Sequence, residues 1–141
     1  MDSTTALFRA TDVFPSGRAS MRPSVDILFE RITRLQYRMA ITAEELYLVL
    51  DEAISNAMEH GNGWDEKKDV TVTTVLDEES LTITVQDQGS GYTDHPSYDA
   101  LQPLRSRRGC DLFLISSLCP VARNALGNEL RISIQRSEPL P

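Results

Sequence analysis

The sequence has few of the residues that build covalent or metal-linked frameworks. It contains two cysteines and two histidines in 141 residues. Cys110 and Cys119 belong to no Cys-x-x-Cys pair, so the sequence indicates neither a disulfide framework nor a zinc site. We expect both side chains to be reduced thiols.

Long apolar runs and an excess of positive charge are also missing. No segment approaches the roughly 20 consecutive apolar residues that span a bilayer, and the first residues lack a basic start followed by an apolar run. The formal net charge of −7 has the wrong sign for electrostatic binding to duplex DNA or an anionic membrane. We therefore expect a soluble, cytoplasmic chain that contacts no nucleic acid and no membrane directly and binds a protein or a small ligand.

The composition that remains is ordinary for a globular protein. Hydrophobic residues make up 40% of the chain and charged residues 25%. No internal repeat and no second domain are visible, which predicts one domain over residues 1–141. The last residues, about 137–141, should be frayed.

Three helices are predicted. Gly and Pro punctuate residues 15–23, which favours a loop, and Ser24 can cap a helix after it. Thr42 and Glu45 form a capping-box signature for the second helix, which Gly61 should end. The third helix is expected over 112–118. The apolar positions of the first two helices recur at helical spacing and are Val25, Leu28, Ile32, Leu35 and Met39, then Leu46, Val49, Leu50, Ala53, Ala57 and Met58.

Strand patterns surround these helices. Segments 69–77 and 80–87 are rich in Val, Thr and Ile and should pair as an antiparallel hairpin. Segments 121–125 and 129–136 form a second expected hairpin, with a turn at 127–128, and segment 5–13 favours an edge strand. The pattern predicts an α/β (α+β) fold with a largely antiparallel sheet.

One candidate motif lies on the second predicted helix, where Glu52, Asn56 and His60 recur at intervals of four residues. This spacing places the three side chains on one helix face. A carboxylate can act as a general base and an amide oxygen can join a Mg²⁺ shell. In isolation, Glu52 and Asn56 are also compatible with ordinary solvated positions. For His60, an interaction with the last helix carbonyls is the competing interpretation.

The second motif, Asp87-x-Gly89-x-Gly91, follows a predicted strand. Glycines let the backbone approach a ligand closely, although such a pattern alone is often only a turn. Together the two motifs predict a site that holds a metal-bound triphosphate.

The order of these motifs resembles a known superfamily. Three segments are similar to the N, G1 and G2 boxes of GHKL ATPases: Glu52 with Asn56, Asp87-Gln88-Gly89-Ser90-Gly91, and Arg108-Gly109-Cys110-Asp111-Leu112. The resemblance is closest to the small anti-sigma-factor serine kinases of the RsbW and SpoIIAB type and extends over nearly the whole chain. It is carried by Glu45-Leu46, Asp51-Glu52-Ala53-Ile54-Ser55-Asn56-Ala57, Gly91-Tyr92 and Leu112-Phe113-Leu114-Ile115. It implies a Bergerat-type sandwich of a mixed, largely antiparallel sheet and about three helices. A short lid, about 92–108, and the lack of a preceding phosphoacceptor-histidine helix distinguish the chain from complete sensor histidine kinases.

The resemblance implies roles for the motif residues. Asn56 would ligate Mg²⁺, and Glu52 would orient or deprotonate a serine hydroxyl. Asp87 would accept a hydrogen bond from the exocyclic amine of adenine. Gly89 and Gly91 would make room for the nucleotide.

The resemblance also implies a phosphate site in the third segment. Backbone amides around Gly109, with Cys110 and Leu112, would face phosphate at the start of the third helix. Arg105, Arg107 and Arg108 would add positive charge, or would belong to a solvated lid.

The implied function is an ATP- and Mg²⁺-dependent protein serine kinase. It would sequester a sigma factor and phosphorylate a STAS-type anti-anti-sigma protein, as a homodimer that uses the first helix or the sheet edge.

Asp111 departs from this pattern, because the G2 box usually has glycine there. A charge near the phosphates would weaken ATP binding by about one to three decades, whereas an acid turned away would stabilise the first turn of the helix. Asp111 therefore keeps open the alternative of a non-catalytic partner-binding module. A separate alternative is a stand-alone ATPase domain of a histidine-kinase pathway.

Overall fold

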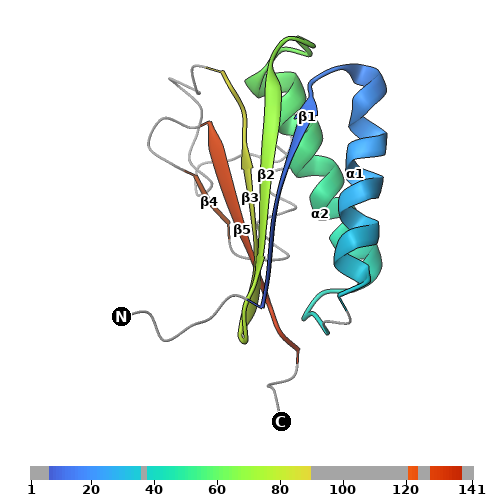
Figure 1. Ribbon diagram of the computed structural model, residues 1–141, viewed down its shortest axis with the longest axis vertical. Helices are drawn as coiled ribbons and strands as arrows, with labels where there is room; N and C mark the ends of the chain where they lie inside the picture. Colours follow the sequence, from blue (N-terminus) through green and yellow to red (C-terminus); the bar gives the residue numbers. More distant parts are fainter. Residues whose placement is uncertain (1–6, 36–37, 90–120, 124–127, 138–141) are drawn as a thin grey trace, which may run out of the picture.

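The computed structural model describes residues 7–35, 38–89, 121–123 and 128–137. Five strands form an antiparallel sheet in the order β1-β2-β3-β5-β4, and two helices cover one face of it (Figure 1). The elements are β1 (Phe8–Pro15), α1 (Arg18–Thr33), α2 (Ala43–Asn56), η1 (Ala57–Gly61), β2 (Asp69–Leu76), β3 (Ser80–Gln86), β4 (Val121–Arg123) and β5 (Glu129–Gln135). The predicted α/β fold is confirmed, and every strand pair within the described residues is antiparallel.

Alternation of residue type along the strands creates the core. In β2 every second residue, Val70, Val72, Thr74 and Leu76, is buried, whereas the residues that alternate with them are only partly buried. The facing stripe of α2 is apolar and buried, as predicted. Truncation of a fully buried leucine such as Leu46 or Leu50 would cost about 2 to 5 kcal/mol.

The start of α1 differs from the sequence prediction. The helix begins at Arg18, after an N-cap at Gly17, so the loop predicted over 15–23 is wrong from residue 18 onward and Pro23 lies inside the helix. Ser24 is not a cap: it is buried, and its hydroxyl donates to the carbonyl oxygen four residues earlier (2.6 Å). Proline removes one N–H and one i to i−4 bond. Packing of the following apolar residues outweighs this local cost.

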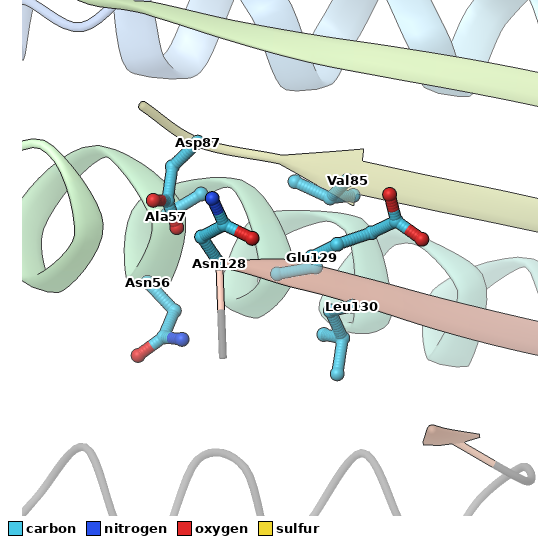
Figure 2. Close-up of a pocket in the computed structure, with 8 residues that line it drawn as sticks. Asn56, Ala57, Val85, Asp87, Asn128, Glu129 and Leu130 are labelled. Carbon is cyan, nitrogen blue, oxygen red and sulfur yellow. The ribbon is translucent and has the colours of Figure 1, made fainter. Parts of the chain in front are cut away.

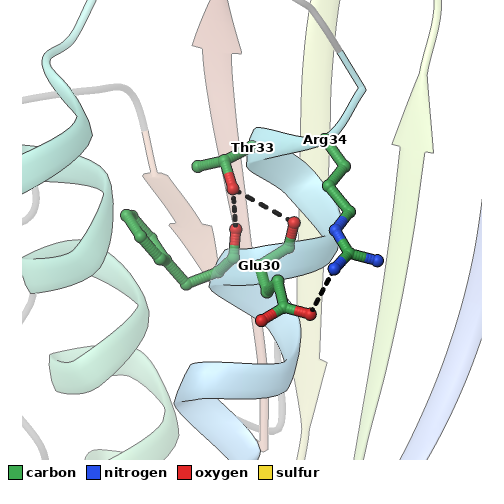
Figure 3. Close-up of polar contacts among 4 residues, drawn as sticks. Glu30, Thr33 and Arg34 are labelled. Atoms are coloured by element: carbon green, nitrogen blue, oxygen red, sulfur yellow. Dashed lines mark hydrogen bonds and ion pairs between the residues drawn. The ribbon is translucent and has the colours of Figure 1, made fainter.

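The end of α1 is shown in Figure 3. The hydroxyl of Thr33 donates to the carbonyls of Phe29 (2.9 Å) and Glu30 (3.0 Å), and the exposed Arg34 pairs with Glu30 (3.1 Å). The helix ends at Thr33, so Leu35 and Met39 lie beyond it, and Met39 forms an isolated antiparallel bridge with Arg136. The helix therefore ends before the apolar pattern does.

Side-chain contacts fix α1 against its neighbours. Arg31 forms an ion pair with Asp12 of β1. Between α1 and α2, Arg22 of α1 donates to the hydroxyl of Tyr47 of α2 (2.8 Å). This hydroxyl in turn donates to Asp26 of α1 (2.7 Å). The hydrogen bond to Asp26 is the largest influence that raises the pKa of Tyr47 above its ordinary value. These contacts join α1 to both β1 and α2.

The predicted capping box of α2 is confirmed. The side chain of Thr42 accepts from the N–H of Glu45 (3.0 Å), and the carboxylate of Glu45 accepts from the N–H of Thr42 (2.8 Å). The helix then runs into the π-helical turn η1, and helical structure ends at Gly61 as expected. The cap therefore sets the start of the helix that carries Glu52 and Asn56.

Several predicted elements fall outside the described residues. These are the third helix over 112–118, the lid over 92–108, both cysteines and most of the tail after 137. The hairpins 69–77 with 80–87 and 121–125 with 129–136 are confirmed where they are described. Neither described helix has the length and apolar content that a bilayer span requires.

Candidate functional site

A small pocket lies where α2 passes into η1, beside the ends of β3 and β5 (Figure 2). The empty space between its walls, counted together with the open solvent at its mouth, is about 240 Å³. The lining residues are Ala53, Asn56, Ala57, Val85, Asp87, Asn128, Glu129 and Leu130. The two sequence motifs therefore meet: Asn56 and Asp87, which are far apart in the chain, line one pocket.

Asn56 is the residue of the first motif that α2 contributes to the pocket wall. Glu52 and Asn56 lie one turn apart on α2; Asn56 is buried, with 6% of its surface exposed, and Glu52 is partly buried. Figure 2 shows the amide of Asn56 directed away from Asp87. The two polar groups therefore face different parts of the site.

His60 does not continue this line of side chains. It lies in the π-helical turn, where the N–H of Asn62 donates to the carbonyl of Ala57 five residues earlier (2.9 Å). A π turn contains more residues than an α turn, so the four-residue spacing no longer returns to the same face. His60 is exposed while Asn56 is buried. The prediction that all three side chains share one face is wrong at His60.

Asp87 is packed between two glycines. Its Oδ1 atom accepts a hydrogen bond from the N–H of Gly89 (2.8 Å), and only 7% of the residue is exposed. A Cβ placed on Gly61 would overlap Cγ and Oδ2 of Asp87, and a Cβ on Gly89 would overlap the carbonyl oxygen of Gly61. Gly61 therefore makes room for the carboxylate, and Gly89 makes room for the backbone of Gly61. Sequence reasoning identified Gly89 but treated Gly61 only as a helix stop.

The third wall comes from the start of β5, which sequence reasoning did not assign to the site. The N–H of Asp87 donates to the carbonyl of Asn128 (2.9 Å), and Gln86 pairs with Glu129 in the sheet. Asn128 had been predicted only as a turn residue. Its contribution depends on strand register, which no local motif specifies.

The remaining predicted site residues are not described. Gly91, Arg105, Arg107, Arg108, Gly109, Cys110, Asp111 and Leu112 all lie in 90–120, outside the described residues. Their roles stay predictions.

The described side chains match the needs of a magnesium–nucleotide complex better than those of a bare metal site. No group of three or more His, Cys, Asp or Glu side chains with metal-binding geometry occurs among the described residues. Mg²⁺ in nucleotide sites takes one or two protein ligands, and the phosphates and water supply the rest. The single amide of Asn56, which lines the pocket, fits that donor set.

Two comparisons with known proteins give different results. No curated protein matches the chain. A family model for the histidine kinase-like ATPase domain matches residues 27–134, which include α2, the pocket and the whole β2–β3 hairpin. Because the match extends over most of the sequence, this chain belongs to the histidine kinase-like ATPase domain family.

Proposed function

We propose that this chain binds ATP with Mg²⁺ in the pocket beside α2 and acts as an ATP-dependent protein serine/threonine kinase of the anti-sigma regulatory type. The observation that carries the proposal is the arrangement at Asp87. Its carboxylate is held by Gly89, packed against Gly61 and placed in the same pocket as Asn56.

The pocket supports adenine binding at Asp87. Because Oδ1 is fixed by the N–H of Gly89, the carboxylate has a defined direction from which to accept a hydrogen bond from an exocyclic amine. In this proposal a flat base would lie against the described walls, and the sugar and phosphates would extend out of the pocket.

Asn56 and Glu52 support chemistry at the other end of the nucleotide. The amide oxygen of Asn56 would be the protein ligand of Mg²⁺, which supplies charge neutralisation on the phosphates when bound. Glu52, one turn earlier on α2, would accept the proton of a serine hydroxyl. The serine oxygen then bonds to the γ-phosphorus, and the bond between that phosphorus and the β,γ-bridging oxygen breaks to release ADP.

The biological role follows the resemblance described above. In this proposed role, the chain sequesters a sigma factor and phosphorylates a STAS-type anti-anti-sigma protein. It does so in the cytoplasm, as a homodimer. A phosphoserine adds close to two negative charges. Since the chain carries a formal net charge of −7, this phosphate would weaken the complex and release the phosphorylated partner.

The second candidate is a partner-binding module without kinase activity. Asp111, which stands where the resemblance expects glycine, favours it, because a carboxylate near the phosphates would oppose ATP binding.

Phosphoryl transfer tests the proposal directly. The purified chain is mixed with γ-labelled ATP, Mg²⁺ and candidate STAS-domain proteins, and the label is followed through acid treatment. We expect acid-stable phosphoserine on the STAS protein, and no label on a variant whose acceptor serine is alanine.

Two other outcomes would contradict the kinase proposal. Acid-labile label would indicate phosphohistidine and a detached histidine-kinase ATPase domain. Stable complex formation with a STAS protein or sigma factor, without any label, would indicate the non-catalytic module.

A further inference from the structure

Asn62 is a buried side chain next to the pocket that the proposed chemistry does not use. Only 3% of the residue is exposed. Its Nδ2 group donates to Ser16 Oγ (2.7 Å) and to the carbonyl of Asp69 (3.0 Å), and its Oδ1 accepts from the N–H of Gln88 (2.8 Å). One amide thus connects the end of β1, the start of β2 and the segment after β3.

The bond to Gln88 has a direct relation to the pocket. The N–H of Gln88 belongs to the peptide plane that also contains the carbonyl of Asp87, so holding it fixes the ψ angle of Asp87. The side chain of Gln88 in turn accepts from the N–H of Asp69. The orientation of the Asp87 carboxylate relative to Gly89 therefore depends on Asn62.

Three consecutive N–H groups in this segment have partners. Asp87 donates to the carbonyl of Asn128 (2.9 Å) and Gly89 to the carboxylate of Asp87 (2.8 Å). Between them, Gln88 donates to Asn62, the only one of the three whose acceptor is a side chain from a distant segment. A substitution at residue 62 can therefore change this peptide without changing any residue that lines the pocket.

We propose that Asn62 is a positioning residue that sets the direction of the Asp87 carboxylate and thereby the preference of the site for adenine over bases without an exocyclic amine. The inference rests on the proposed nucleotide function and adds a residue that determines its base specificity. Asn62 acts through Gln88 and contacts no nucleotide itself.

The test compares the dissociation constants of ATP and inosine triphosphate, which lacks the exocyclic amine. We expect the native chain to prefer ATP by about tenfold or more. Asn62→Ala should lower ATP affinity about tenfold, the effect of one lost hydrogen bond, and leave inosine triphosphate nearly unchanged. Asn62→Leu, which removes the bonds but fills more of the space, provides the same comparison if the alanine variant does not fold.

Two further variants separate positioning from simple stability. Ser16→Ala removes a buried partner of Asn62 but keeps the bond to Gln88, so it should lower stability and leave the ATP to inosine triphosphate ratio at the native value. Asn62→Asp keeps the acceptor for Gln88 but loses the donor to Ser16 and Asp69, so the folded variant should be less stable and still have a ratio closer to the native value than Asn62→Ala has. An unchanged ratio in folded Asn62→Ala or Asn62→Leu would overturn the role of Asn62 alone. Failure of the native chain to bind either nucleotide would overturn the proposed function and this inference with it.

Discussion

Replacing Glu52 with glutamine is expected to lower the rate of phosphoryl transfer by about 10²- to 10⁴-fold, the usual contribution of a general base. Glutamine has nearly the shape of glutamate but cannot accept the proton of the serine hydroxyl. ATP affinity should stay near the native value, because Asn56 and Asp87, and not Glu52, are assigned to nucleotide binding. Single-turnover kinetics with saturating ATP measures the chemical step directly.

A matched control is available on the same helix. Glu44 lies in the first turn of α2, is exposed and lines no part of the pocket. Glu44→Gln makes the same chemical change and should leave the transfer rate unchanged. A Glu52→Gln variant that transfers phosphate at the native rate would remove Glu52 from the mechanism.

Replacing Gly61 with alanine is expected to lower ATP affinity by about 10- to 100-fold, corresponding to the 1 to 3 kcal/mol typical of overpacking. The backbone of Gly61 has no positive φ, so alanine suits its conformation. The added Cβ would overlap Cγ and Oδ2 of Asp87, which would have to move. Titration calorimetry with ATP measures the loss, and thermal unfolding establishes that the variant is folded.

Gly63 provides the control for Gly61. It has φ of +61° and nothing within 4 Å of an added Cβ, so alanine there is strained but unobstructed. Gly63→Ala should cost about 1 to 2 kcal/mol in stability and leave ATP affinity unchanged. If both variants lose affinity equally, the effect belongs to the loop as a whole and the packing account of Gly61 is wrong.

The fold was predictable where local patterns and tertiary packing agree. The capping box of Thr42 and Glu45 specifies the start of α2. The alternation of polar and apolar residues over 69–77 specifies β2. Both patterns involve only residues close together in sequence. The start of α1 was not predictable in this way. Pro23 reads locally as a breaker, but the helix continues because Val25 and Leu28 are packed in the core.

The site residues likewise divide into those that local sequence predicts and those that depend on contacts between distant segments. Asp87 and Gly89 are only two positions apart in sequence, so spacing and residue type were enough to select them. Gly61 and Asn62 became visible only when the end of η1 was placed against the segment after β3. Asn128 lies in the site because the register of β3 with β5 places it beside Asp87. Contacts between segments distant in sequence leave no local signature.

Calorimetric titration with ATP, with and without Mg²⁺, tests the central claim most directly. The native chain should bind ATP saturably and more tightly with Mg²⁺, and Asn56→Ala should lose the magnesium-dependent part of the affinity while keeping the rest. Ser55→Ala, a neighbouring buried position whose hydroxyl bonds to the carbonyl of Glu52 (3.3 Å), is the control and should behave as the native chain. Absence of saturable ATP binding by the native chain would contradict the account.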